Sequence, residues 1–488
     1  MGHDEVMICT QRGIFMSQTK QQTPQKLSKD LAQNMQYMDG RMGLETNFDI
    51  IHRVIRIGDT DACMYLIDGF CKDELMQKLL QYLMDLTPED FPKDAHEMSK
   101  IAIPYVEVDL DDTWEKVLGA LLSGVFVLVV DGYEKAVLID ARTYPARGVE
   151  EPEKDKVLRG SKDGFVETVV FNTALIRRRI RSTDLHMEML NAGANSRTDI
   201  VLCYMENRVD PELLNRVRER IRSIQADALS MNQESLAECL YRRKWYNPFP
   251  KFKYTERPDT AAAHVLEGNL IILVDNSPSA MILPTTIFDV VEEADDYYFP
   301  PVTGTYLRLT RFLIALLTYF VTPTYLLLMN HRMWIPENLA FTILKEEPNV
   351  PLLLQFLLLE LAIDGLRLAA VNTPNMLSTP LSVMAALVLG EFSVESGWFS
   401  PEVMLAMAFV AIANYTQANY ELGYALKFMR ILNLILTQCF GLWGYLLGIA
   451  VTVFAIFTNK TISGQSYLYP LFPLDMQKLK KRLIRRRM

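Results

Sequence analysis

The sequence predicts an α/β cytoplasmic region of two related subdomains, followed by an α-helical transmembrane domain of about four to six segments. Residues up to about 298 have charges spread throughout, as in a soluble protein. Residues 307–457 are instead dominated by Leu, Ala, Ile, Val and Phe, in blocks of roughly 17 to 25 residues, which is the length needed to cross a hydrocarbon core. A helix and strand pattern also occurs twice before these blocks. The mean hydropathy of +0.07 therefore averages two unlike halves.

The repeated pattern defines the two subdomains. Leu121–Asp131 reads LLSGVFVLVVD, Val265–Asp275 reads VLEGNLIILVD, and the spacing continues without a gap to Ala136 and Ala280. Each copy predicts a helix, a glycine that ends it in the left-handed conformation, a buried strand, a turn and a second strand. Upstream of each copy, a strand followed by a helix also occurs, at nearly the same distance in the two subdomains. We infer two related units; a chance resemblance between two βαβ-like units is the alternative.

Changes in composition predict the domain boundaries. The first residues are rich in Gln, Lys, Ser and Thr, which favours a mobile segment with one short helix from Lys26 to Met38. A charged stretch with several Gly and Pro residues predicts a linker between the subdomains. The predicted parts are a flexible lead-in (1–47), a first α/β subdomain (48–145), a linker (146–162), a second α/β subdomain (163–300), a helical membrane domain (301–460) and a basic cytoplasmic tail (461–488).

Apolar blocks predict the membrane segments. Leu307–Met329 follows a start marked by Arg308 and Arg311, and arginines at such a position indicate a cytoplasmic end. Leu426–Phe457 is long enough for one tilted helix or for two segments that break near Gly441. Cytoplasmic termini require an even number of crossings, so either one block is re-entrant or the last block splits. The remaining blocks are Pro351–Val371, Leu377–Phe392 and Pro401–Thr416.

The charge distribution indicates where the termini lie and which partners are excluded. A formal net charge of −9 argues against general nucleic-acid affinity. Residues 1–45 contain no apolar core of signal-peptide type, so we expect the α/β half in the cytoplasm. The last eleven residues carry seven positive charges, which predicts a cytoplasmic C-terminus near anionic lipid. A solvated tail without lipid contact is the alternative.

Motifs of catalysis and cofactor binding are absent from the sequence. It contains no GxxxxGK[ST], no GxGxxG after a strand, no HExxH and no GxSxG. The six cysteines are scattered, without a CxxC pair or a histidine at metal-ligand spacing, which is typical of reduced structural thiols. We therefore expect a protein that is not an enzyme and has no catalytic residue, no cofactor and no metal site.

The strongest physical signal is a charged face within an apolar segment. Polar side chains in Pro351–Val371 recur near i, i+4 and i+7 and so share one helical face. An ionisable side chain at membrane depth costs roughly 2.5 to 3.5 kcal/mol, so such residues persist mainly where they face protein or water. One interpretation is a pathway or gate, and the other is an intramembrane ion pair or an interfacial helix. The candidate pore or gate residues are Gln355, Glu360, Asp364 and Arg367.

A polar stretch joins the two halves of the chain. Lys253–Asp259 reads KYTERPD, with alternating charges and a proline, whereas the helix and strand after it repeat an element of the first subdomain. The second subdomain and the first apolar block both connect to this stretch, so we expect any coupling between them to pass through it. The candidate coupling residues are Tyr254, Glu256, Arg257 and Asp259.

This stretch and its neighbours also carry motifs of a known family. The chain reads PFPKFKYTERPD at 248–259, LEG at 266–268, DNSP at 275–278 and PTT at 284–286, with a further match at 374–382. With these motifs it strongly resembles the A-subunit family of spore germinant receptors, the GerA family, over almost its whole length. The short N-terminal region without a long charged extension resembles a sporulation protein of that family more than a nutrient receptor subunit.

The resemblance implies a location, a fold and partners. It implies the inner membrane of endospores, a cytoplasmic region of two related subdomains, and membrane helices that assemble into an oligomeric ion channel. Nutrient receptors of this type work with B and C subunits, in which the B subunit binds the nutrient and the A subunit opens. The partners implied are further copies of the chain, other membrane proteins of the germination apparatus and the lipid bilayer, but no nucleic acid.

The leading hypothesis from the sequence is a subunit of a homo-oligomeric cation channel that opens during germination. The alternative is a scaffold that clusters germinant receptors without conducting ions. A secondary transporter is a weaker alternative, because such folds commonly contain repeats within the membrane domain and none is visible between residues 307 and 457.

Overall fold

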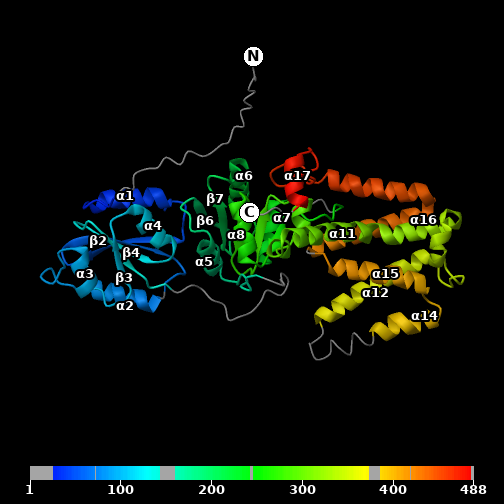
Figure 1. Ribbon diagram of the computed structural model, residues 1–488, viewed down its shortest axis with the longest axis horizontal. Helices are drawn as coiled ribbons and strands as arrows, with labels where there is room; N and C mark the ends of the chain where they lie inside the picture. The colour runs from blue at the N-terminus through cyan, green and yellow to red at the C-terminus, as the bar shows by residue number, and fades with distance from the viewer. Residues whose placement is uncertain are drawn as a thin grey trace, which may run out of the picture. The chain divides into compact units, whose positions relative to one another are not determined.

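The computed structural model describes residues 26–71, 73–142, 160–241, 246–372, 385–417 and 419–484. These residues divide into two compact units, whose elements are labelled in Figure 1. The first unit falls within residues 1–44 and 50–144, and the second within residues 45–49 and 145–488. The second unit therefore combines an α/β subdomain with the helical region.

The first unit is a five-stranded antiparallel sheet between two layers of helices. Its strand order is β1-β2-β4-β5-β3. Helices α2 and α3 pack on one face of the sheet, and α1 and α4 lie on the other (Figure 1). Both faces are covered, so every residue of β4 and β5 is buried. The elements are α1 (Leu31–Met42), β1 (Ile50–Ile57), β2 (Thr60–Ile67), α2 (Asp73–Met84), α3 (Ala95–Ile101), β3 (Val108–Asp111), α4 (Trp114–Leu122), β4 (Phe126–Val130) and β5 (Ala136–Ile139).

The α/β subdomain of the second unit has the same architecture. Its strand order, β6-β7-β9-β10-β8, matches the first sheet position by position, and all its strand pairs are antiparallel. Helices α6 and α7 pack on one face, and α5 and α8 on the other. The elements are α5 (Val169–Arg179), β6 (Leu185–Ala192), β7 (Thr198–Met205), α6 (Pro211–Arg222), α7 (Asn232–Leu240), β8 (Lys253–Thr255), α8 (Pro258–Leu266), β9 (Leu270–Val274) and β10 (Ala280–Leu283).

The predicted internal repeat is confirmed down to individual hydrogen bonds. The helix-ending glycines, Gly124 and Gly268, have φ angles of +93° and +97°, in the left-handed region that glycine adopts readily. The aspartate after each central strand, Asp131 or Asp275, accepts from a backbone N–H at the start of α1 or α5, at 3.0 and 3.1 Å. A carboxylate at these positions stabilises the first helix of each unit.

The first unit starts earlier than the sequence predicted. Helix α1 lies in the range predicted as a flexible lead-in, but it packs against β2 and β4 through Leu31, Met38 and Met42, which are all buried. It corresponds to α5 of the second subdomain, whose apolar face was easier to recognise. The first α/β unit therefore begins before residue 48.

The helical region follows the second sheet. Two of its described helices, α11 and α16, are long and apolar enough to cross a membrane. Part of the predicted block Leu377–Phe392 lies outside the described residues. The elements are α9 (Ile287–Val291), α10 (Asp295–Tyr298), α11 (Pro301–Asn330), η1 (Arg332–Trp334), η2 (Glu337–Thr342), α12 (Leu352–Asn372), η3 (Ala386–Phe392), α14 (Ser393–Glu395), α15 (Pro401–Tyr415), α16 (Tyr420–Phe457) and α17 (Met476–Leu483).

Helix α16 is a hairpin of two helical arms. The chain reverses at Gly441, where φ is +57° and ψ is −131°, a conformation open essentially to glycine alone. A Cβ atom on Gly444 would lie 1.8 Å from the carbonyl oxygen of Leu436, and one on Gly448 would lie 2.3 Å from the Asn433 side chain. The arms pack closely because these positions lack side chains. Of the two arrangements that the sequence left open for this block, the structure has two segments.

Candidate functional site

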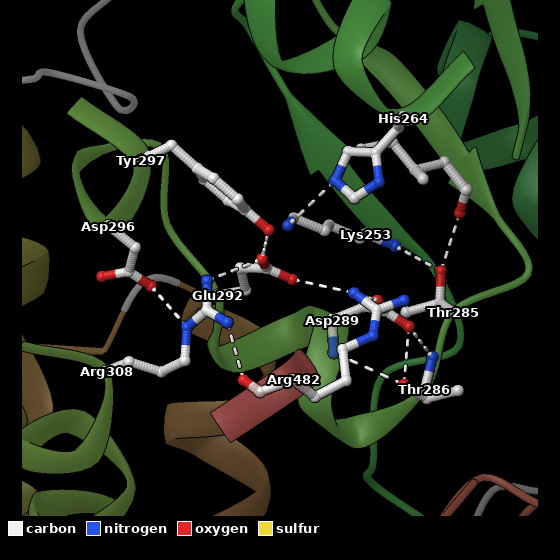
Figure 2. A network of polar contacts seen from close by, with 11 residues as sticks. Lys253, His264, Thr285, Thr286, Asp289, Glu292, Asp296, Tyr297, Arg308 and Arg482 are labelled. Carbon is white, nitrogen blue, oxygen red and sulfur yellow. Dashed lines mark hydrogen bonds and ion pairs between the residues drawn. The ribbon is translucent and has the colours of Figure 1, made fainter. Parts of the chain in front are cut away.

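Two buried clusters of ionisable side chains lie in the second unit, and the first joins the α/β subdomain to the helical region. We call it the junction network (Figure 2). It draws side chains from β8 and α8 of the subdomain, from α9 to α11, and from the C-terminal helix α17. Its members are Lys253, His264, Thr285, Thr286, Asp289, Glu292, Asp296, Tyr297, Arg308 and Arg482.

Arg308 occupies the centre of the junction network on the helical side. It is 2% exposed and lies on the second turn of α11. Its Nη2 is 2.9 Å from Glu292, its Nε is 3.2 Å from Asp296, and its Nη1 donates to the backbone carbonyl oxygen of Arg482 at 2.7 Å. Arg311 pairs with the second oxygen of Asp296 at 2.6 Å. The start of α11 is therefore held on both sides, by the acidic segment before it and by the C-terminal helix.

Arg482 connects the C-terminal helix to α9, which follows the last strand of the α/β subdomain. Its Nη1 lies 2.7 Å from Asp289 and 3.0 Å from Glu292. Asp289 also caps α9, because it accepts from the N–H and hydroxyl of Thr286 at 2.9 and 2.6 Å. Burial opposes ionisation of Asp289, but the Arg482 guanidinium and the Thr286 hydrogen bonds outweigh it and lower the pKa of this carboxyl below its ordinary value. Asp289 is therefore a buried carboxylate that depends on Arg482.

A buried lysine and histidine complete the network on the subdomain side. The Lys253 ammonium lies 3.4 Å from Nε2 of His264, and both side chains are less than one-tenth exposed. Burial, and then the positive charge of Lys253, lower the pKa of His264 to about 3. Nδ1 of the ring has no hydrogen-bond partner among the described residues. The imidazole is therefore neutral near pH 7.

The predicted coupling residues lie next to the junction network. Arg257 forms an ion pair with Asp259 at the start of α8 and also donates to the carbonyl oxygen of Ser161 at 2.8 Å. Asp259 accepts a hydrogen bond from the hydroxyl of Tyr298, which lies in α10 directly before α11. These two residues thus link the subdomain to the segment that leads into the helices.

The other two predicted coupling residues form hydrogen bonds within the subdomain. The hydroxyl of Tyr254 donates to Glu234 in α7 at 3.2 Å. Glu256 uses its backbone carbonyl oxygen to accept from Phe165 at 2.8 Å. Arg257 and Asp259 therefore contact the segment that leads into the helices, whereas Tyr254 and Glu256 line a pocket with Tyr420 and Glu421 at the start of α16.

The second cluster lies among the helices, and we call it the helix charge cluster. Glu360 of α12 is 3% exposed and accepts from Arg430 of α16, with Nε at 2.9 Å. Lys427, one turn before Arg430, lies 3.4 Å from Glu360 and pairs with Asp364. Arg430 also donates to the carbonyl oxygen of Thr318 in α11 at 2.8 Å. Two carboxylates and two cations thus hold three helices together.

The four predicted pore or gate residues do not form one site. Glu360 and Asp364 belong to the helix charge cluster, but Gln355 and Arg367 lie elsewhere on α12. Gln355 accepts from the backbone N–H of Ser400 at 2.9 Å, ahead of α15. The guanidinium of Arg367 lies over the ring of Tyr415, 5.0 Å from its centroid, and also near Tyr424. This face of α12 therefore contacts both α15 and the first arm of α16 along its length.

The sequence prediction missed the cations that complete both clusters. Lys427 and Arg430 are spaced three apart inside an apolar block, which is the same signal that identified α12. Arg482 was visible only as part of a basic tail, and its pairing with Asp289 depends on a return of the chain to the second subdomain. Among the described residues, no group of three or more His, Cys, Asp and Glu is placed to hold a metal ion.

Comparison with known protein families agrees with the sequence motifs found at residues 248–286. The family model described as "Bacillus/Clostridium GerA spore germination protein" matches residues 37–488. The chain belongs to the GerA family of spore germination proteins. Its α11 and α16 helices, which are long and apolar enough to cross a membrane, agree with a membrane-associated member of this family.

Individual relatives within the GerA family cover most of the chain. Stage V sporulation protein AF of Bacillus subtilis is 37% identical over 461 residues, which are 94% of this chain and 93% of the relative. This is the sporulation protein that the short N-terminal region indicated. Spore germination protein KA of the same organism is 27% identical over 478 residues, 96% of this chain and 86% of the relative.

A solved structure also matches the N-terminal part of this GerA protein. It is the crystal structure of the N-terminal domain of the A subunit of the Bacillus megaterium spore germinant receptor GerK3. The match has 25% sequence identity and a TM-score of 0.39, and it covers 54% of this chain and 98% of the other.

Proposed function

We propose that this GerA protein is a membrane subunit of a spore germination complex and forms an oligomeric channel for cations that opens during germination. The observation that carries the proposal is the helix charge cluster. Glu360, Asp364, Lys427 and Arg430 lie on helices that are mostly apolar, and Glu360 and Arg430 are almost completely buried.

The energetics of the cluster favour a role in ion passage. Each ionisable group at membrane depth costs several kcal/mol, and a cluster of well-packed apolar residues would hold the same helices at no such cost. Intramembrane ionisable groups commonly mark ion pathways for this reason. Asp364 supports such a role most directly, because its side chain is 30% exposed while it contacts Lys427. In an oligomer, this carboxylate would face the cation path, and Glu360 would hold the side chains of Lys427 and Arg430 behind it.

The junction network supports a coupling between the α/β subdomain and this path. Arg308 lies at the start of α11, and α11 supplies a carbonyl oxygen to the helix charge cluster through Thr318. A rotation of the subdomain would move Arg308 with Glu292 and shift α11 against α12 and α16. Helix α11 contacts both clusters, so a change in either cluster would alter the position of this helix.

We also propose a location and partners. The chain would lie in the spore inner membrane as a multi-pass protein with a cytoplasmic N-terminal region and a cytoplasmic C-terminus. Basic residues of α17 and the arginines at the start of α11 lie on the same side of the helical region, as the positive-inside rule requires of one cytoplasmic face. Partners would be further copies of the chain and other membrane proteins of the germination apparatus.

A receptor-clustering scaffold is the second candidate function. One observation favours it: Glu360 already has two cationic partners within a single chain, so the helix charge cluster satisfies its own charges. An ion pair of this kind can serve to fix helix packing alone. A scaffold predicts that the cluster affects stability without affecting ion flux.

Ion flux from liposomes distinguishes the two functions. Purified full-length protein is reconstituted, and cation efflux is measured for the wild type, Asp364→Asn, Glu360→Gln and the control Glu395→Gln, an exposed carboxylate in the same region. A channel predicts cation flux that Asp364→Asn changes and Glu395→Gln leaves intact. No flux from correctly folded wild-type protein under any condition would refute the channel and favour the scaffold. Substrate-dependent flux that saturates at low concentration would instead support a transporter.

A further inference from the structure

A cavity of about 700 Å³ lies where the α/β subdomain of the second unit meets the ends of the α16 hairpin. One wall comes from the segment around Pro248 and from Tyr241, and the other from the first turns of α16 and the residues just after it. Its polar, charged and aromatic lining residues include Tyr241, Lys251, Glu421, Phe428, Asn459 and Lys460. No part of the junction network or of the helix charge cluster lines it.

Asn459 provides the first sign that the cavity takes a ligand. Its side chain is 1% exposed, and neither its amide nitrogen nor its amide oxygen has a hydrogen-bond partner among the described residues. A buried amide without partners destabilises a protein, because burial removes its hydrogen bonds to water and nothing replaces them. Asn459 lines the cavity, so a turn of its side chain would bring the buried amide to a molecule held there.

The charges around the cavity indicate the sign of that ligand. Lys251 is 8% exposed, donates to the carbonyl oxygen of Lys460 at 3.1 Å and lies 4.4 Å from the centroid of the Tyr241 ring. Lys460 is exposed at the rim, and Glu421 carries the one carboxylate among the described lining residues. Two lysines and one glutamate give the described lining residues a formal charge of +1, which matches a ligand with a single negative charge.

The position of the cavity indicates the source of the ligand. The apolar run of the second arm of α16 ends at Phe457 and is followed by Thr458, Asn459 and Lys460, while the first arm begins with Tyr420 and Glu421. Both ends of an apolar hairpin therefore meet at this level, which is where lipid head groups lie. Phe428 lines the cavity and is 55% exposed, so an apolar surface continues from the cavity along the helix.

We propose that this cavity binds the phosphodiester head group of an anionic phospholipid. Lys251 and Lys460 would contact the phosphate, the amide of Asn459 would hydrogen-bond to phosphate or glycerol oxygens, and Phe428 would pack against an acyl chain. The ligand would fill the cavity between the subdomain and the α16 hairpin. The inference requires membrane association only and is independent of ion conduction.

Lipid-dependent thermal unfolding of the full-length protein in detergent tests this proposal. The probes are phosphatidylglycerol, phosphatidylcholine and phosphatidylethanolamine with identical acyl chains, and sn-glycerol 3-phosphate without acyl chains. The expected result is that phosphatidylglycerol raises the unfolding midpoint at the lowest concentration. Equal effects of the zwitterionic lipids would overturn the charge argument, and an equal effect of glycerol phosphate would overturn the lipid as its source.

Two variants and a control locate the effect. Lys460→Gln, at an exposed position, should weaken the phosphatidylglycerol response about tenfold in concentration, and Lys345→Gln, an exposed lysine far along the chain from the cavity lining, should not. Asn459→Leu should raise the midpoint without lipid, because it removes an unpaired buried amide, and should reduce the gain from lipid. Unchanged lipid responses in both variants would refute the site.

Discussion

Replacement of Arg482 by Met tests the junction network most sharply. The side chain is 27% exposed and contributes ion pairs at 2.7 Å to Asp289 and 3.0 Å to Glu292. Without it, Asp289 keeps its two hydrogen bonds from Thr286, and Glu292 keeps its pair with Arg308. Each carboxylate is left only partly satisfied, so the loss should be about 1 to 3 kcal/mol rather than the larger cost of an isolated buried charge.

The assay is thermal unfolding of the purified protein in detergent, followed by intrinsic fluorescence. A loss of that size should lower the unfolding midpoint by about 1 to 4 °C for a unit of this size. Lys480→Met is the matched control, because it removes the same charge from an exposed position of the same helix. The control should change the midpoint little, since an exposed charge contributes at most about 1 kcal/mol.

A double-mutant cycle with Asp289→Asn identifies the contact responsible. Arg482→Met and Asp289→Asn share one ion pair, so the double variant should lose at least about 1 kcal/mol less than the sum of the single losses. Additive losses, or an effect of Lys480→Met as large as that of Arg482→Met, would refute the inference that Arg482 holds the C-terminal helix against α9.

Three further predictions follow from named contacts in the second unit. Arg430→Met should destabilise the protein by about 3 to 5 kcal/mol in thermal unfolding. The double variant Arg430→Met with Glu360→Met should recover most of that loss, because it leaves no buried charge unpaired. A double variant without recovery would contradict the pairing. His264 binds a proton in the unfolded chain below pH 6.5 but in the folded protein only near pH 3, so the stability of the protein should fall as the pH drops below 6.5. The expected loss is about 1 kcal/mol between pH 7.5 and 5.5, and it should disappear in His264→Gln. The same pH profile for both proteins would argue against a buried neutral ring. Gly444→Ala should destabilise the α16 hairpin by about 1 to 3 kcal/mol, because its Cβ would meet a carbonyl oxygen of the other arm, whereas Gly423→Ala, with open space around it, should be neutral or slightly stabilising in the same assay.

Much of the α/β fold was predictable because it is encoded locally and twice. The pattern of Gly124 and its following strand recurs at Gly268, and the glycine, the buried strand and the turn each follow from neighbouring residues. The role of α1 was harder to predict, because its few apolar residues gain meaning only from the sheet beneath them. The break in α16 was one of two predicted options, and the close packing at Gly444 and Gly448 explains why the chain turns there.

The site was only partly predictable, because ion pairing is a tertiary property. The spacing on α12 identified Glu360 and Asp364 as unusual but gave no information about their partners on α16, more than 60 residues away along the chain. Gln355 and Arg367, which the same spacing grouped with them, contact Ser400 and the rings of Tyr415 and Tyr424 instead, since residues on one helical face can contact different neighbours along its length. Arg308 was interpreted as a topology marker, and its buried contacts with Glu292 and Asp296 became visible only in the fold.

The central claim, that the helix charge cluster belongs to a cation pathway, is tested most directly by the reversal potential of reconstituted protein in a planar bilayer under a potassium chloride gradient. The channel predicts a cation-selective current for the wild type and a reversal potential that shifts toward zero in Asp364→Asn, with Glu395→Gln unchanged. A wild-type protein that is folded and oligomeric but carries no current, or a reversal potential that Asp364→Asn does not alter, would contradict the claim.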